Sequence, residues 1–165
     1  MYYSAVCPSP LGMLTLGSDG EHLIGLWLEG QKYFGGAVRE VLEERDGLPV
    51  FDAARDWLAR YFAGEKPMPS ELCPIGGEFR QRVRSLLCQI PYGETTTYGA
   101  LARALAAQMG RPSMSSQAVG GAVGHNPISI IIPCHRVVGA DGSLTGFGGG
   151  IETKKALLEL ERAEY

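Results

Sequence analysis

Short apolar segments alternate with turn residues over the first thirty positions of the chain. The segments YYSAVC, MLTLG and HLIGLWL are separated by Pro10-Leu11-Gly12 and by Asp19-Gly20, which are typical of tight turns. Runs of this length joined by short turns are the pattern of an antiparallel meander, in which each strand pairs with the next. We therefore expect a small antiparallel sheet in this part of the chain.

The apolar spacing becomes helical between residues 51 and 62. This segment, FDAARDWLARYF, places its large apolar side chains three and four positions apart, and Ala63-Gly64 after it suits a helix C-cap. The stretch 64–77 is rich in Pro and Gly and interrupts the pattern as a linker does. We expect an α/β domain with its linker over residues 1–76 and a second domain over residues 77–165.

Helical periodicity dominates the second half of the chain. Phe79, Val83 and Leu87 lie on one face of residues 78–90, and Pro91 ends that pattern. Threonines at 95–97 can cap the following helix. We expect a mostly helical domain with helices over 78–90, 97–109, 113–124 and 152–165. The last helix should turn Ala156, Leu157, Leu160 and Ala163 inward and expose Glu152, Lys154, Lys155 and Glu159.

The helices over 97–109 and 113–124 are joined by a turn that contains Gly, which is consistent with a helix-turn-helix. The second of these helices has unusually many small residues: Ala118, Gly120, Gly121, Ala122 and Gly124. Glycine inside a helix costs about 0.5 to 1 kcal/mol relative to alanine, so a close neighbour should compensate. A packed helix and a nucleic-acid backbone both fit this requirement.

The segment ISIIIP (128–133) predicts a short buried strand that ends at Pro133, directly before Cys134-His135-Arg136. A cysteine is nucleophilic as the thiolate, and a nearby imidazole is a common means of forming it. Side chains of adjacent residues on an extended chain point to opposite faces, so a turn or a bridging water would have to join thiol and imidazole. Asn126 before Pro127 is suited to tying such a turn, and a Gly-rich loop follows at 139–150.

Composition limits the classes of function that remain. The four cysteines are dispersed without a C-x-x-C pair, and no basic leader or long apolar span is present, so we expect reduced thiols and a cytoplasmic location without membrane insertion. The net charge is −3. Residues 1–77 contain six Lys and Arg against eleven Asp and Glu, whereas residues 78–165 contain nine against seven. Any contact with nucleic acid therefore belongs to the second half.

These motifs together resemble the O6-alkylguanine-DNA alkyltransferase family, which has a PCHRV active-site motif. The resemblance extends over 78–161 and includes IPYGETTTYGALA, AVGGAVGHNPISIIIPCHRVVG and LTGFGGGIETKKALLELE, and YFAGE at 61–65 is similar to bacterial members. It implies a ribonuclease H-like α/β N-terminal domain and a C-terminal domain containing a winged helix-turn-helix.

The resemblance implies a DNA repair protein that flips an alkylated guanine out of the duplex and transfers the O6-alkyl group irreversibly to its own Cys134. O4-alkylthymine is an expected second substrate, and each molecule acts once. The implied partner is double-stranded DNA bound through the minor groove. We expect a monomer that uses no cofactor. A zinc site needs four well-spaced ligands, and Cys7, His22 and Cys73 are scattered over the acidic half, so we expect no metal.

The same resemblance implies roles for individual residues. His135 would act as a water-mediated base on Cys134, Glu161 would orient His135, and Asn126 would tie the active-site turn. Tyr98 would turn the DNA backbone and hydrogen-bond the leaving guanine, while Arg136 would be structural. The implied DNA contacts are Thr97, Tyr98, Ser116, Gln117, Ala118 and Gly121, and the guanine pocket would be lined by Val137, Phe147 and Gly148.

Three positions depart from the family pattern. Gln117 stands where members usually carry an arginine that fills the gap left by the flipped base, so we expect weaker DNA binding. Phe147 replaces a frequent tyrosine, which keeps the stacking wall and removes a hydroxyl. Arg84 stands where bacterial relatives usually have tryptophan.

Two other functions are compatible with parts of the pattern. Alkyltransferase-like proteins recognise damage without repairing it, but they lack the cysteine that this chain has at 134. A cysteine hydrolase could use Cys134 and His135, but it would need an oxyanion site that no other motif suggests. Alkyl transfer is therefore the favoured hypothesis.

Overall fold

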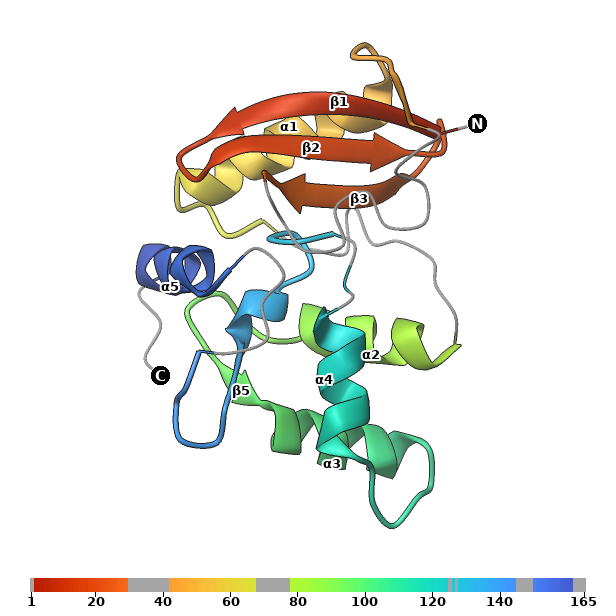
Figure 1. Ribbon diagram of the computed structural model, residues 1–165, viewed down its shortest axis with the longest axis vertical. Coiled ribbons are helices and arrows are strands. Elements are labelled where there is room, and N and C mark those ends of the chain that lie inside the picture. Colours follow the sequence, from red (N-terminus) through yellow and green to blue (C-terminus); the bar gives the residue numbers. More distant parts are fainter. Residues whose placement is uncertain are drawn as a thin grey trace.

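The N-terminal half forms one sheet covered by one helix. The computed structural model describes residues 2–29, 42–67, 78–124, 126, 128–144 and 150–161, and everything said below concerns these residues (Figure 1). The elements of this half are β1 (Tyr2–Ser9), β2 (Gly12–Ser18), β3 (Leu23–Leu28), β4 (Leu42–Glu44) and α1 (Pro49–Phe62).

The sheet is mixed rather than purely antiparallel. Its strand order is β3-β2-β1-β4, and the two hairpin pairings are antiparallel as expected, with Ser9 opposite Gly12 at the first turn. β4 pairs in parallel with β1, so that Tyr2 lies opposite Leu42. The antiparallel pairing expected within the first thirty residues is confirmed. β4 lies outside that stretch and was not predicted, because a strand of three residues leaves no alternating pattern to detect.

Helix α1 covers one face of the sheet and packs against β2 and β3. A proline at its start favours helix initiation, and Gly64 beyond the C-cap adopts a φ of 84°, which glycine tolerates without strain. Its buried side chains follow the predicted spacing: Phe51, Ala54, Trp57, Leu58 and Tyr61. The predicted helix over 51–62 is therefore present and begins two residues earlier.

The C-terminal half is mainly helical. It contains α2 (Glu78–Cys88), β5 (Thr96–Thr97), α3 (Tyr98–Gln108), α4 (Ser116–Gly124), a 3-10 turn (Cys134–Arg136), β6 (Val137–Val138) and α5 (Ile151–Leu160). Helices α2, α3 and α4 pack on one another, and β5 pairs in parallel with β6 beside α3. Figure 1 shows these helices on the opposite side of the molecule from the sheet, with α5 between the two layers.

The apolar run after α4 is not the strand that its composition suggests. Residues 128–132 form successive turns in which Ile132 N–H donates to Ile128 C=O (3.2 Å), and Ile130 has a φ of 71°. The run meets the sheet at Leu26, where Ile128 forms an isolated β-bridge and Ser129 N–H donates to Leu26 C=O (3.2 Å). The isoleucines are fully buried, but an apolar run indicates burial and leaves the backbone conformation undetermined.

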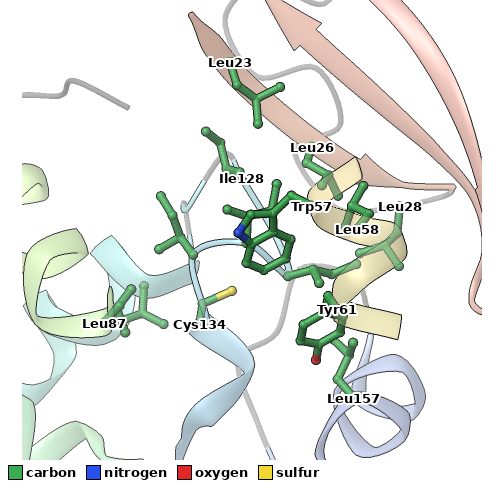
Figure 2. Packing of buried hydrophobic residues seen from close by; sticks show 14 of the residues in the cluster. Leu23, Leu26, Leu28, Trp57, Leu58, Tyr61, Leu87, Ile128, Cys134 and Leu157 are labelled. Carbon is green, nitrogen blue, oxygen red and sulfur yellow. The ribbon is translucent and has the colours of Figure 1, made fainter. Parts of the chain in front are cut away.

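One apolar core runs through both halves. It joins Leu26 of the sheet, Trp57 of α1, Leu87 of α2, Cys134 and Leu157 of α5, as Figure 2 shows. The thiol of Cys134 therefore lies at the junction of the two halves.

Candidate active site around Cys134

Cys134 begins the 3-10 turn and is only 5% exposed. Its N–H donates to Ile132 C=O (2.7 Å), and Arg136 N–H donates to Pro133 C=O (3.0 Å). This turn replaces the extended geometry that would send neighbouring side chains to opposite faces. Cys134, His135 and Arg136 can therefore all face the interior, and all three are buried.

Asn126 holds the turn that leads to the cysteine. Its Nδ2 donates to the C=O groups of Ile128 and Ile132 (both 3.1 Å), and its Oδ1 accepts from Ile128 N–H (3.1 Å). The side chain is buried, so these bonds satisfy backbone groups that water does not reach. They also support Ile130, a β-branched residue in a left-handed conformation that such residues seldom adopt.

Glu161 is the centre of a buried hydrogen-bond network. Its Oε1 accepts from Arg136 Nε (2.8 Å) and Gly93 N–H (3.3 Å). Its Oε2 accepts from Tyr61 Oη (2.5 Å), His135 Nε2 (2.6 Å) and Arg136 Nη2 (3.2 Å). Burial opposes ionisation, but the hydrogen bonds and charges of His135 and Arg136 prevail and lower the pKa of Glu161 to about 2.

The carboxylate determines which nitrogen of His135 carries the proton. Because Glu161 only accepts, Nε2 must be the N–H, and Nδ1 then has the free lone pair. Nδ1 is buried and has no hydrogen-bond partner among the residues that the structure describes. Burial lowers the pKa of His135 and outweighs the raising effect of Glu161, so the imidazole is neutral near pH 7 and Nδ1 is a base.

Cys134 needs such a base. Burial raises the pKa of its thiol, while contact with Asn126 and the charge of Lys154 act in the opposite direction. The thiol is therefore protonated in the resting protein and reacts once a nearby group accepts its proton.

Tyr98 and Lys154 complete the surroundings of the thiol. Tyr98 is the first residue of α3, and Lys154 Nζ lies 5.9 Å from the centre of its ring. Burial raises the pKa of the Tyr98 hydroxyl, and the nearby Cys134 raises it further. Burial lowers the pKa of Lys154 to about 8, with the charge of Cys134 acting against this shift.

The expectation that Lys154 lies on a solvated helix face was wrong. Lys154 is fully buried, and its Nζ donates to Val137 C=O. It shares a helical face with Leu157 and Leu158 at positions i, i+3 and i+4, and this spacing was the signal that could have revealed its burial. Leu160, expected inside, is instead 38% exposed. Ala163 lies outside the described residues.

The predicted DNA contacts lie at the start of α3 and along α4, two helices that pack on each other. Thr97 caps α3, with its hydroxyl accepting from Ala100 N–H (3.1 Å). The remaining candidates on α4 are exposed: Ser116, Gln117, Ala118 and Gly121. A Cβ at Gly121 would meet no atom within 4 Å among the described residues, so internal packing does not require glycine there.

The predicted guanine pocket is only partly described. Val137 is fully buried on β6, next to the 3-10 turn. Phe147 and Gly148 lie outside the described residues, so their predicted part in the pocket stays a prediction.

Comparisons with known proteins match both halves of the chain. Residues 78–163 match the model of the 6-O-methylguanine DNA methyltransferase DNA-binding domain, and residues 1–75 match that of the ribonuclease-like domain of the same family. The chain belongs to this family. The predicted fold class, with a ribonuclease-like α/β domain followed by a helical DNA-binding domain, is confirmed.

Individual relatives support the assignment over the full length. The methylated-DNA–protein-cysteine methyltransferase of Haemophilus influenzae is 46% identical over 167 residues, which cover 100% of this chain and 88% of the relative. A crystal structure of the Mycobacterium tuberculosis O6-methylguanine methyltransferase is 47% identical, with a TM-score of 0.80 and coverage of 98% and 93%. A Mycobacterium tuberculosis OGT structure in complex with DNA matches with 45% identity, the same TM-score and coverage of 98% and 92%.

Family membership makes the chain a DNA repair methyltransferase. None of the helices in the described ranges combines the length and apolar composition that a bilayer span requires.

Proposed function

We propose that this chain transfers the alkyl group of O6-alkylguanine in double-stranded DNA to Sγ of its own Cys134, once per molecule. The observation that carries the proposal is the buried alignment of Glu161 with His135, beside Cys134, in which Nδ1 of the imidazole keeps a free lone pair. A neutral buried base next to a protonated thiol is the arrangement that activates a cysteine on demand.

The transfer is a displacement at the alkyl carbon. The thiol proton passes through a bridging water to Nδ1 of His135, and Glu161 stabilises the imidazolium that forms. The sulfur then forms a bond to the alkyl carbon while the bond from that carbon to O6 breaks, and its electron pair remains on guanine. The thioether on Cys134 is stable to water, so the protein is not regenerated.

The guanine must leave as an anion or be stabilised by a hydrogen bond. Tyr98 is suited to this step, since its raised pKa keeps the hydroxyl protonated and able to donate. Its position at the N-terminus of α3 supports the proposal that Tyr98 turns the DNA backbone as the base rotates out. The proton that guanine finally gains balances the one that the thiol loses.

DNA binding is assigned to α3 and α4. The exposed, small side chains of α4 would enter the minor groove, Gln117 would occupy the gap left by the flipped base, and Thr97 and Ser116 would contact phosphates. Flipping costs a few kcal/mol, which contacts to the displaced base and to the gap offset. We extend the proposal to O4-alkylthymine, to a monomeric state and to a domain division at residues 76 and 77.

Intact mass after incubation with an oligonucleotide containing O6-methylguanine tests the proposal. We expect one methyl group to be gained per molecule and to map to Cys134. Cys134→Ser should gain none, whereas Cys88→Ser, which alters a half-buried cysteine of α2, should gain it like the wild type. Specific binding of the damaged duplex without any mass gain would instead identify a damage-recognition protein.

A further inference from the structure

The N-terminal domain contributes a side chain to the network around Glu161. Tyr61, near the end of α1, is 1% exposed, and its hydroxyl donates to Oε2 of Glu161 (2.5 Å) across 100 positions of sequence. Figure 2 shows the Tyr61 ring beside Leu157 of α5. The bond therefore links α1 to the end of α5.

The ring of Tyr61 is held from several sides. It stacks on Trp57 with a centroid separation of 5.5 Å and an interplanar angle of 9°. It also makes edge contacts with Tyr92 at 5.8 Å and with Phe62 at 5.2 Å. Such packing fixes the direction of the hydroxyl, which matters because Oε2 of Glu161 is the same atom that contacts Nε2 of His135.

We propose that Tyr61 is a positioning residue of the alkyl-transfer site, which orients the Glu161 carboxylate and limits the negative charge that His135 experiences. This inference rests on the proposed function for its effect on alkyl transfer. It assigns to the N-terminal domain a direct part in controlling the base that activates Cys134.

Tyr61, His135 and Arg136 share one oxygen atom of Glu161, Oε2. Each donor to Oε2 withdraws electron density and weakens its attraction for a proton on His135. With Tyr61 present, the imidazole competes with a neutral donor; without it, more of the carboxylate charge faces Nε2. Burial, followed by the charge of Glu161, raises the pKa of the Tyr61 hydroxyl, so Tyr61 stays a donor across the working pH range.

Other charged and titratable groups also lie close to His135 and Glu161. Their contributions remain when the Tyr61 hydroxyl is removed, so the change can be attributed to that hydroxyl. They are Arg136 and Cys134 of the 3-10 turn, Lys154 of α5, and Tyr92 of the segment after α2.

The test is Tyr61→Phe in the full-length chain, with methyl transfer measured in a single turnover between about pH 5 and pH 8. We expect the acid limb of the rate profile to move up by about one pH unit, because His135 holds its proton more tightly without the competing donor. Below the wild-type midpoint the rate should fall about tenfold, and at high pH the two profiles should converge.

A matched control separates positioning from stability. Leu58 is buried on the same helix, and Leu58→Ala removes packing without removing a donor to Glu161. We expect Leu58→Ala to lower the melting temperature and leave the pH midpoint unchanged. In a Glu161→Gln background, Tyr61→Phe should have little further effect on the rate.

Titration of His135 by nuclear magnetic resonance provides a readout that does not depend on repair. We expect the His135 midpoint to rise in Tyr61→Phe. If the wild type transfers no methyl group but this midpoint rises, the proposed function fails while the positioning role stands. An unchanged His135 midpoint, or an equal midpoint shift in Leu58→Ala, would overturn the inference about Tyr61.

Discussion

Replacing Asn126 with alanine removes the side chain that ties residues 126–132 into a turn. Three hydrogen bonds are lost, one accepted from Ile128 N–H and two donated to the C=O groups of Ile128 and Ile132. The two carbonyls keep one backbone partner each, since Ile132 N–H donates to Ile128 and Cys134 N–H donates to Ile132. Ile128 N–H has no other acceptor among the described residues, so it becomes the main source of the loss of stability.

The expected loss of stability depends on which backbone groups keep a second hydrogen-bond partner. A buried N–H left without a partner costs about 1 to 3 kcal/mol, and each carbonyl that loses its second bond costs about 0.5 to 1.5 kcal/mol. We expect Asn126→Ala to lower the free energy of unfolding by about 4 kcal/mol, which a domain of ordinary stability survives. The left-handed turn at Ile130 also loses support, so Cys134 should shift from its reactive position.

Urea denaturation and single-turnover methyl transfer together test this reasoning. Misplacement of a reacting group by about 1 Å can reduce a rate about a hundredfold, and we expect a loss of that order under conditions in which the variant is folded. Val83→Ala, a core change in α2 away from the turn, is the control, with a similar loss of stability and a normal rate. Wild-type stability in Asn126→Ala, or a rate that falls no further than that of Val83→Ala, would refute the proposed role of Asn126.

Three further predictions concern charge. The pKa of Glu161 is lowered from 4.5 to about 2 in the folded protein. The ionised carboxylate should therefore stabilise the fold by about 3 kcal/mol at pH values above 4.5, and this contribution should disappear as the pH falls towards 2. Glu161→Gln should abolish that part of the acid dependence in urea titrations; an unchanged slope would contradict the assignment. Lys154→Met should raise the pKa of the Cys134 thiol, seen as a shift to higher pH in its reaction with iodoacetamide, and an unshifted profile would mean that the ammonium does not act on the thiol. Gln117→Arg should tighten binding to duplex DNA in fluorescence anisotropy, because it adds a positive charge at the position where family members usually carry arginine. Equal affinity of the two proteins would show that Gln117 does not weaken DNA binding.

The helices were predictable because their packing follows a local repeat. Residues three and four positions apart share a helix face, so the inward positions of α1 could be identified without knowledge of their partners. The same reasoning identified the pair α3 and α4. It did not identify β4, whose pairing with β1 depends on contacts between distant residues.

The segment before Cys134 shows where apolar composition misleads. Its isoleucines are buried as expected, but turns held by Asn126 replace the predicted strand. The position of Asn126 before Pro127 predicted that its side chain could tie a turn. The sequence pattern did not predict that this amide would bond backbone groups as far along the chain as Ile132. The resulting 3-10 turn is what allows Cys134 and His135 to face the same interior.

The network around Glu161 was only partly predictable. Its link to His135 followed from the family resemblance, and the structure places the two side chains 2.6 Å apart. The sequence pattern predicted Tyr61 as an inward position of an amphipathic helix and as part of the YFAGE segment. It did not predict the bond to Glu161, because the two residues are 100 positions apart. The burial of Lys154 was missed because a charged residue between polar neighbours suggests solvent, whereas its backbone acceptor belongs to another element.

Transfer of an isotopically labelled methyl group tests the central claim most directly. The wild-type chain would be mixed with duplex DNA carrying O6-methylguanine with a deuterated methyl group, digested, and analysed by peptide mass spectrometry. The account predicts one label per molecule, on Cys134, with an equal amount of unmodified guanine in the DNA. Label on another residue, or loss of label from the DNA without its appearance on the protein, would contradict it.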